Sequence, residues 1–231
     1  MRSIRQVASY IKQIIKYPKY FPIYHKNKNF TMFNMACFNY NLKIASKVSV
    51  DGCVVECGTW RGGMIAGWAK LIGNDREYFL FDSFEGLPDV TSKDGESAKN
   101  YQIQTKVDPG YGFDNCKAEM HFAETAMRRS GVANYHLVKG WFNDTLPKFD
   151  KSKKIALLHI DGDWYDSVFC TLENLYDQVT PGGIVIIDDY TNWDGCTRAV
   201  HDFFSKNDLP EKLRQHNNTI TYFIKKGSRN K

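Results

Sequence analysis

Two pairs of aspartates occupy equivalent places in the sequence, each directly after an apolar run. Asp161 and Asp163 follow one run, and Asp188 and Asp189 follow the next. If these runs are neighbouring parallel strands, their carboxyl ends meet at one edge of a sheet, where ligands bind in such folds. Four unpaired carboxylates at that edge would repel one another, and a hard divalent cation such as Mg²⁺ relieves the repulsion. The spacing therefore predicts a metal site.

We predict Asp161, Asp188 and Asp189 as the metal ligands. Asp163 is then left as the catalytic base, and an exchange of roles between Asp161 and Asp163 is the open alternative. A cation chelated by two adjacent substrate oxygens would orient a hydroxyl acceptor and lower its pKa, and the base would complete its deprotonation. Helix capping is the competing interpretation, since Asp is favoured at helix N-termini. It accounts for one acid at each strand end but not for two pairs.

A glycine-rich turn follows an earlier apolar run, with the pattern E-x-G-x-x-x-G from Glu56 to Gly62. Glycines there allow the backbone to approach a ligand closely. Dinucleotide sites instead have the pattern G-x-G-x-x-G, whose helix faces a pyrophosphate, whereas Glu56 suits an ammonium group. Asp82, roughly 20 residues beyond the turn, is placed to bind ribose hydroxyls. S-adenosylmethionine carries an ammonium group and a ribose, and it has no phosphate.

We therefore predict an S-adenosylmethionine site at the carboxyl ends of the first three strands. From the first turn and the second strand, its residues are Glu56, Gly58, Thr59, Trp60, Gly62, Asp82 and Ser83. At the end of the third strand the chain can pass near an adenine edge, which adds Gly140 and Trp141. Asp161 is expected to border both the cofactor and the metal.

The elements that must position these residues alternate between strand and helix. Apolar runs predict strands at 53–56, 78–81, 135–138, 155–160, 184–187 and 219–224. Apolar periodicity predicts helices at 62–72, 117–129, 165–179 and 197–205. Such alternation predicts a mostly parallel sheet covered on both faces. We expect an α/β fold of the Rossmann-like class I methyltransferase type, with a seven-stranded sheet and additional N-terminal helices.

Two regions depart from this alternation. Residues 3–16 have a 3.6-residue apolar period that predicts an amphipathic helix, ended by Pro18 and Pro22, and a second helix is expected over 31–47. Residues 86–114 are rich in Gly, Asp, Ser and Lys without periodicity, which indicates a lid or a disordered loop. The predicted domain organisation is a basic helical extension over 1–50, a methyltransferase domain over 51–225 and a basic tail over 226–231.

Positive charge is concentrated in the first 50 residues, which hold nine Lys or Arg and no Asp or Glu. A basic extension on an acidic remainder favours an anionic partner: a membrane surface or lipid-linked acceptor, an anionic substrate, or the second subunit of a homodimer. A solvated helix without a partner is the alternative. The chain has no run of about 18 apolar residues and no signal-peptide core, so we expect a cytoplasmic protein, located at most at the inner face of a membrane. Six cysteines without C-x-x-C spacing indicate free thiols.

With these residues identified, the chain resembles the macrocin O-methyltransferase family, which acts on sugars of macrolides and related natural products. The resemblance covers about residues 31–204. Its motifs are 55–62, 81–88, 139–142 with 145–147, 160–163, 181–183, 188–190, and Gly195-Cys196 ahead of Ala199-Val200. It implies S-adenosylmethionine, Mg²⁺ and methylation of a sugar hydroxyl, with the metal at Asp161, Asp188 and Asp189 and with Asp163 as a candidate base. The segments before residue 31 and over 89–115 depart from the family pattern.

The leading hypothesis is an S-adenosylmethionine- and Mg²⁺-dependent O-methyltransferase that acts on a sugar hydroxyl of a glycoconjugate, a polysaccharide precursor or a natural product. One alternative is a catechol-type O-methyltransferase, which uses the same metal chemistry on a small vicinal diol. Another is a non-catalytic cofactor-binding scaffold, which would not need two acidic pairs. A nucleic-acid substrate is not expected, because the chain lacks an Asn-Pro-Pro-Tyr-like motif for a flipped base. The sequence does not identify the acceptor.

Overall fold

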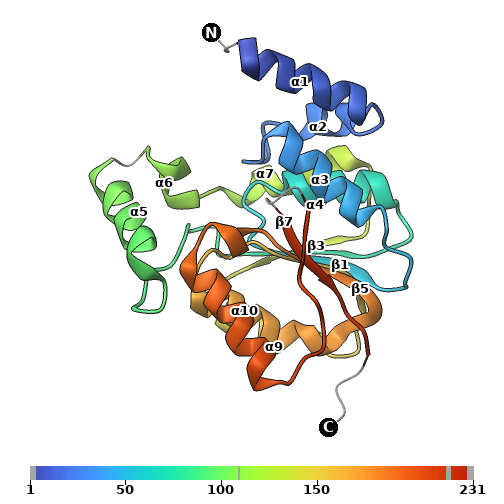
Figure 1. Ribbon diagram of the computed structural model, residues 1–231. Coiled ribbons are helices and arrows are strands. Elements are labelled where there is room, and N and C mark those ends of the chain that lie inside the picture. The colour runs from blue at the N-terminus through green and yellow to red at the C-terminus, as the bar shows by residue number, and fades with distance from the viewer. Residues whose placement is uncertain (1–3, 109, 217–219, 228–231) are drawn as a thin grey trace.

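A seven-stranded sheet in the order β3-β2-β1-β4-β5-β7-β6 forms the centre of the computed structural model, which describes residues 4–108, 110–216 and 220–227 (Figure 1). The strands are β1 (Cys53–Cys57), β2 (Tyr78–Asp82), β3 (Tyr135–Lys139), β4 (Ile155–Ile160), β5 (Val179–Ile187), β6 (Arg214–His216) and β7 (Ile220–Ile224). β1 to β5 are parallel, whereas β7 runs antiparallel to β5 and β6 antiparallel to β7. The predicted fold is therefore confirmed.

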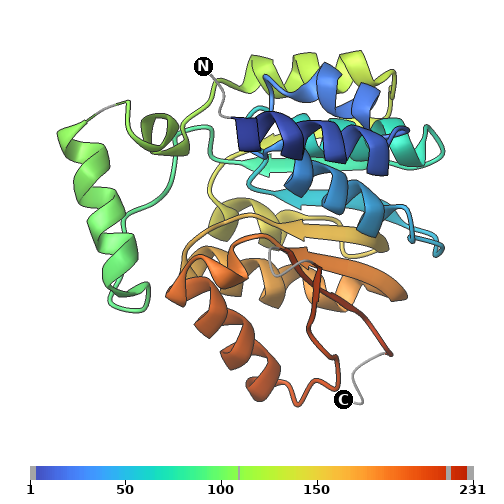
Figure 2. The same ribbon diagram turned by 45° about the horizontal axis from the view of Figure 1, so that its top comes forward.

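Helices cover both faces of this sheet (Figure 2). One face packs against α3 (Met35–Ala45), α4 (Gly63–Ile72) and α7 (Met120–Ser130), and the other against α8 (Phe142–Thr145), α9 (Tyr165–Leu175) and α10 (Asp194–Lys206). Successive strand residues point to opposite faces, so Leu157 joins the core with Trp68 and Leu158 joins the core with Phe203. Burial on both faces explains why the central strands β1 and β4 are largely apolar in the sequence.

The N-terminal region contains one helix more than predicted. α1 (Ile4–Lys16) contacts α3, and α2 (Phe21–Asn27), which was not predicted, contacts α3 and α4. Pro22 did not exclude a helix, because it lies in the first turn of α2, where its missing N–H is not needed. The predicted helix start at Ser3 lies outside the described residues.

The helix predicted over 31–47 begins later, at Met35. Asn34 Oδ1 accepts hydrogen bonds from the N–H groups of Ala36 and Cys37, at 2.9 and 3.1 Å, and so caps α3. Residues 30–33 are consequently left outside the helix. The boundary at residue 50 and the anionic partner of the basic residues stay predictions, and so does a homodimer.

The segment over 86–114, predicted to be a lid or a disordered loop, contains the helix α5 (Gly95–Val107). The prediction of a disordered loop is therefore wrong, and a role as a lid stays a prediction. Only Ala98 and Gln102 of α5 are buried, so the helix has no apolar stripe that a sequence pattern could reveal. It stands away from the sheet in Figure 2. The following turn, α6 (Gly112–Cys116), is left-handed, with φ of 57, 58 and 54° at Phe113, Asp114 and Asn115. Left-handed backbone costs about 1–2 kcal/mol per non-glycine residue.

Smaller differences occur at the ends of the other elements. β6 was not predicted, because a strand of Arg, Gln and His has no apolar alternation. The helix predicted over 165–179 ends at Leu175, and β5 begins at Val179 instead of residue 184. The described part of the chain also contains three 3-10 helices: η1 (Leu146–Lys148), η2 (Tyr176–Gln178) and η3 (Asp189–Thr191). The predicted strand start at Thr219 and tail residues 228–231 lie outside the described residues. None of the helices described here has both the length and the apolar composition needed to cross a bilayer.

Candidate active site

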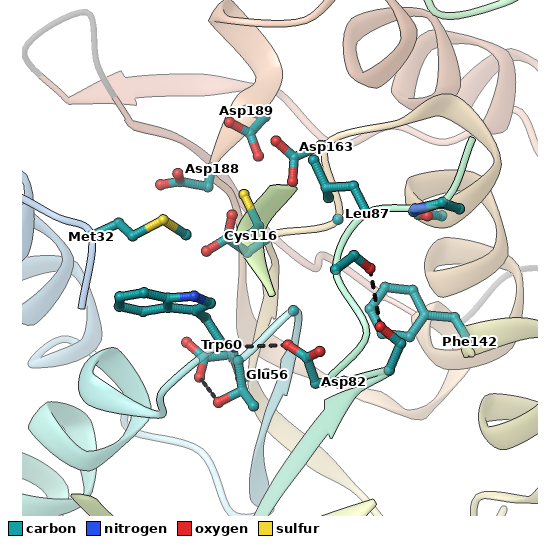
Figure 3. A pocket seen from close by; sticks show the side chains of 18 of the residues that line it. Met32, Glu56, Trp60, Asp82, Leu87, Cys116, Phe142, Asp163, Asp188 and Asp189 are labelled. Carbon is teal, nitrogen blue, oxygen red and sulfur yellow. Dashed lines mark hydrogen bonds between the residues drawn. The ribbon is translucent and has the colours of Figure 1, made fainter. Parts of the chain in front are cut away.

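A cavity of about 570 Å³ lies at the carboxyl edge of the sheet (Figure 3). Its walls come from the turns after β1, β2, β3, β4 and β5 and from residues 30–33 and 86–88. The predicted site residues that line it are Glu56, Gly58, Thr59, Trp60, Asp82, Ser83, Trp141, Asp161, Asp163, Asp188 and Asp189. Gly62 and Gly140 are not among the lining residues. One cavity thus contains both the predicted cofactor residues and the predicted metal ligands.

The two predicted glycines of the first turn have different surroundings. Gly58 has a φ of 91°, and a Cβ atom there would lie 1.7 Å from the carbonyl oxygen of Asp161, so glycine lets the ends of β1 and β4 come together. Gly62 has a φ of 76°, and a Cβ atom there would lie 2.9 Å from Cα of Ala123 in α7. Gly58 therefore shapes the cavity, whereas Gly62 allows α4 to pack against α7.

Glu56, the last but one residue of β1, is held in place on both carboxylate oxygens. Thr59 Oγ1 donates a hydrogen bond of 2.6 Å to Oε2, and His159 Nδ1 lies 3.1 Å from Oε1. Glu56 and His159 are direct neighbours in the β1–β4 pairing, and both are almost fully buried. The carboxylate therefore has a defined orientation at the cavity wall, where it can bind a cationic group.

Asp82, at the end of β2, organises the backbone around the cavity. Its Oδ2 accepts a hydrogen bond from the N–H of Trp60 and its Oδ1 from the N–H of Phe84, both at 2.7 Å. Trp60 and Phe84 have φ of 47 and 57°, so Asp82 stabilises two residues in the left-handed region. Burial raises the pKa of Asp82, although these N–H donors oppose the shift. A carboxylate has further lone pairs for hydroxyl groups of a ligand.

Ser83, Gly140 and Trp141 continue the wall beside Asp82. The Ser83 hydroxyl accepts from the N–H of Glu85 and donates to the carbonyl of Gly86, both at 3.0 Å, which closes a local turn. The N–H of Gly140 donates to the carbonyl of Asp82 at 2.9 Å. Trp141 follows and lines the cavity with its side chain exposed. Ser83 and Gly140 therefore shape the wall, and Trp141 is the side chain available to a flat ring.

Asp163, Asp188 and Asp189 lie together in Figure 3, on the side of the cavity opposite Glu56 and Asp82. Asp161, Asp163 and Asp189 can each place a carboxylate oxygen within 4.8 Å of the others. Asp188 lines the same cavity and is not part of this group, so the closest trio contains Asp163 where the sequence predicted Asp188. Asp189 Oδ2 is buried and has no hydrogen-bond partner among the described residues.

Burial acts on all four carboxyl groups, and repulsion by neighbouring aspartates acts on Asp161, Asp163 and Asp188 as well. Loss of solvation raises the pKa of Asp161 well above its usual range, and the charge of Asp188 raises it further. The pKa values of Asp163 and Asp188 are also raised well above the usual range, first by burial and then by the charge of Asp189. Burial raises the pKa of Asp189 as well. The cluster is therefore costly to ionise without a cation.

Asp163 is distinguished by its backbone and by its partner. Its φ is 54°, and the N–H of Trp164 donates to the carbonyl of Gly162 at 2.6 Å across it. Trp193 Nε1 donates a hydrogen bond of 2.8 Å to Asp163 Oδ1. Trp193 also lines the cavity, whereas Tyr165 and Tyr190, two further aromatic residues near the strand ends, are not among the lining residues.

Several lining residues were not predicted from the sequence. They are Phe30, Thr31, Met32, Phe33, Met64, Gly86, Leu87, Pro88, Cys116, Phe142, Asn143, Gly162, Asp166, Ser167, Cys170 and Asn192. Phe142 and Gly162 adjoin predicted residues, so extending each motif by one position would have found them. Residues 30–33 and Cys116 approach from distant segments, and no local pattern marks them.

The family model described as Macrocin-O-methyltransferase (TylF) matches residues 31–225. A demethyldecarbamoylnovobiocin O-methyltransferase of Streptomyces niveus is 34% identical over 176 residues, which cover 71% of this chain and 63% of the relative. The 8-demethyl-8-(2,3-dimethoxy-alpha-L-rhamnosyl)-tetracenomycin-C 4'-O-methyltransferase of Streptomyces olivaceus is 32% identical, covering 75% of this chain and 66% of the relative. The matched region thus spans just under two thirds of both relatives.

Among solved structures, the O-methyltransferase NovP has a similar fold. The TM-score is 0.71 at 29% sequence identity, and the comparison covers 86% of this chain and 83% of the other. Residues 1–30, which include α1 and α2, lie outside the part matched by the family model. The matched part contains every predicted site residue.

Proposed function

This chain belongs to the macrocin O-methyltransferase family, and we propose from that premise that it transfers the methyl group of S-adenosylmethionine to a sugar hydroxyl of a small-molecule or glycan acceptor, with Mg²⁺ bound beside the cofactor. One observation carries the proposal: Glu56 and Asp82 face the aspartate cluster across a single cavity. A relative named for a rhamnosyl 4'-O-methyl transfer supports a sugar acceptor.

The cofactor would lie along the ends of β1, β2 and β3. Glu56, oriented by Thr59 and His159, would bind the ammonium group. Asp82 would accept hydrogen bonds from the ribose hydroxyls with the lone pairs that its two backbone donors leave free. Trp141 would pack against the adenine, since an exposed aromatic ring at the cavity wall suits a flat heterocycle.

The aspartate cluster fits a hard divalent cation. Three carboxylates converge, one buried oxygen of Asp189 has no other partner among the described residues, and an all-oxygen donor set suits Mg²⁺. Asp161 and Asp189 belong both to the predicted ligand set and to the trio in the structure, and Asp188 or Asp163 would complete the site. Bound Mg²⁺ would supply positive charge that orients the acceptor and favours its ionised hydroxyl.

Asp163 is our choice for the general base. Trp193 occupies its Oδ1, which leaves Oδ2 to take the proton from the acceptor hydroxyl. The acceptor oxygen would then form a bond to the methyl carbon as the carbon–sulfur bond breaks, and the products are a methyl ether and S-adenosylhomocysteine. Trp193 lines this side of the cavity and would help to exclude water from the reacting atoms.

Mass spectrometry of reaction mixtures tests the proposal. Purified protein is incubated with S-adenosylmethionine, Mg²⁺ and three acceptor panels: sugar nucleotides, glycosylated natural products and catechols. We expect one added methyl group on a sugar, and no product when a chelator is present. Methylation of catechols alone would contradict the sugar acceptor. Cofactor binding without product on any acceptor would favour the non-catalytic scaffold. Full activity in the presence of a chelator would contradict the dependence on Mg²⁺.

A further inference from the structure

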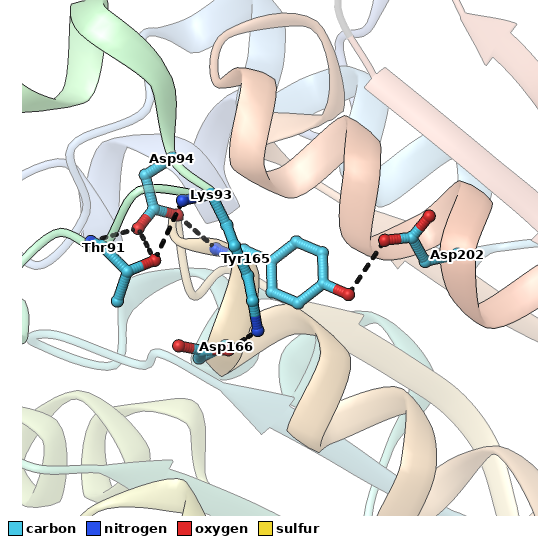
Figure 4. Close-up of polar contacts among 6 residues, drawn as sticks. All are labelled: Thr91, Lys93, Asp94, Tyr165, Asp166 and Asp202. Carbon is cyan, nitrogen blue, oxygen red and sulfur yellow. Dashed lines mark hydrogen bonds and ion pairs between the residues drawn. The ribbon is translucent and has the colours of Figure 1, made fainter.

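Asp94 is a buried carboxylate that lies outside the cavity and has no part in the proposed chemistry. Its side chain is 1% exposed. Oδ2 accepts hydrogen bonds from the N–H and the hydroxyl of Thr91, at 2.7 and 2.9 Å, and Oδ1 accepts one from the N–H of Tyr165 at 2.7 Å (Figure 4). Thr91 and Asp94 lie at the start of the segment that carries α5, whereas Tyr165 is the first residue of α9. Asp94 therefore connects these two parts of the chain.

The N-terminal ends of three helices meet at Asp94. The residue itself precedes α5, its Oδ1 caps α9, and α10 begins alongside. A Cβ atom on Gly195, in the first turn of α10, would lie only 2.3 Å from Asp94 Oδ1, so this turn requires glycine. Helix N-termini stabilise negative charge. This arrangement explains how a carboxylate can be buried here without an ion pair to its sequence neighbour Lys93, which instead contacts Asp166 at 2.9 Å.

Two residues of the proposed active site directly precede the helices that Asp94 contacts. Asp163 lies two positions before Tyr165 and has a φ of 54°, a conformation that costs energy and persists only when the surroundings hold it. Trp193 lies two positions before Gly195 and donates its indole N–H to Asp163. The neighbouring Trp164 donates its own indole N–H to the carbonyl of Pro88 at 3.0 Å, which is a second link to the same segment.

We propose that Asp94 is a positioning residue for the active site. By capping α9 and packing against α10, it holds Asp163 in its left-handed conformation and keeps Trp193 within hydrogen-bond distance of it. The inference rests on the proposed function, because the role of Asp163 does. It gives Asp94 a role in shaping the active site, although only residues 86–88 of the segment over 86–95 line the cavity.

The same region provides matched controls. Lys93 lies 4.2 Å from the ring centre of Tyr165 and pairs with Asp166, and the Tyr165 hydroxyl donates to Asp202 at 2.9 Å. Lys93, Asp166 and Asp202 are exposed, and exposed ion pairs contribute little. The Lys93→Ala and Tyr165→Phe variants remove these outer contacts but keep the bond from the Tyr165 N–H to Asp94.

The experiment compares Asp94→Ala and Asp94→Asn with these two controls. For Asp94→Ala we expect kcat for methyl transfer to fall by about 10- to 100-fold, as for residues that orient functional side chains. S-adenosylhomocysteine binding should change by less than about twofold, because the hydrogen bonds of Asp94 go to Thr91 and Tyr165 and not to Glu56 or Asp82. The Asp94→Asn variant keeps an acceptor oxygen for the Tyr165 N–H and should recover part of the loss. Both controls should match the wild type.

A double-variant cycle separates positioning from general stability. If Asp94 acts through Asp163, the pair Asp94→Ala and Asp163→Asn should have the same kcat as Asp163→Asn alone. An unchanged kcat in the folded Asp94→Ala variant would overturn the inference. Equal losses in kcat and S-adenosylhomocysteine binding, together with a lower Tm, would also overturn it, because they indicate a purely structural role. Failure of the proposed function itself would instead show as a wild-type protein that gives no methylated product on any acceptor.

Discussion

The two sides of the cavity are built in different ways. On the side proposed for the cofactor, Glu56 and Asp82 lie at strand ends, and every one of their carboxylate oxygens has a contact between 2.6 and 3.1 Å. On the side proposed for the acceptor, part of the wall comes from connecting segments, which contribute Cys116 and Trp193. The backbone pairing of the sheet positions the first side, whereas a few side-chain contacts position the second. We therefore expect changes on the two sides to affect different steps.

The largest difference between metal binding and cofactor binding is expected for Asp189→Ala. It removes the buried Oδ2 atom that has no other described partner, and loss of a metal ligand should reduce Mn²⁺ binding and methyl transfer by at least about 100-fold. Calorimetry with S-adenosylhomocysteine should show little change. Asp188→Ala and Asp163→Ala, measured in the same way, identify the third ligand. If Asp189→Ala weakened the binding of Mn²⁺ and of S-adenosylhomocysteine equally, the two sides of the cavity would not be independent.

Glu56→Gln should have the reverse effect, with weaker cofactor binding and unchanged metal binding. Hydrogen bonds to charged groups contribute about 1.5–3 kcal/mol, so S-adenosylhomocysteine should bind about 10- to 100-fold more weakly. Binding of methylthioadenosine, which lacks the amino-acid group, should not change, and neither should Mn²⁺ binding. Calorimetry measures all three. The Asp82→Asn variant is the matched comparison, since it should weaken the binding of both S-adenosylhomocysteine and methylthioadenosine. If it weakened only the binding of S-adenosylhomocysteine, the proposed contact of Asp82 with the ribose would be contradicted.

The acceptor side should also make stability dependent on pH and on the metal. The pKa values of Asp161, Asp163 and Asp188 are raised in the folded protein, so the folded state binds more protons than the unfolded state above the usual value of 3.8. Stability then falls as the pH rises through this window. Thermal denaturation without metal should give a higher Tm at mildly acidic than at neutral pH. Mg²⁺ should raise the neutral Tm, and an identical Tm with and without Mg²⁺ would count against the site.

The smallest effect is expected in α5. Ile103 and Val107 are 56 and 76% exposed, so Ile103→Ser and Val107→Ser should change the free energy of unfolding by less than about 0.5 kcal/mol. Leu157→Ala, in the buried centre of β4, should destabilise the protein by about 2–5 kcal/mol. Urea denaturation measures both. A large loss in the α5 variants would show that this segment is part of the core.

Sequence reasoning placed residues in the cavity correctly where their position follows from a strand end. Glu56, Asp82 and the two aspartate pairs were found in this way, because apolar runs reveal buried strands and the topology brings their ends together. The contacts of Asp94 could not be found, since its partner Tyr165 is 71 residues away. The left-handed conformation of Asp163 depends on such distant contacts as well. The position of residues 30–33 was missed because the cap at Asn34 shifted the helix start.

Substitutions accumulate most easily at positions where they hardly change the stability of the fold, and most positions of α5 are of this kind. Its outer face can change freely, because Ala98 and Gln102 are its only buried residues. The turn that follows ends at Cys116, which lines the cavity, and Trp60 contacts this turn through the ring of Phe113. Drift in this segment can thus alter the outline of the cavity while the sheet and its cofactor residues stay as they are. A lineage with this architecture can acquire new acceptors without rebuilding its chemistry.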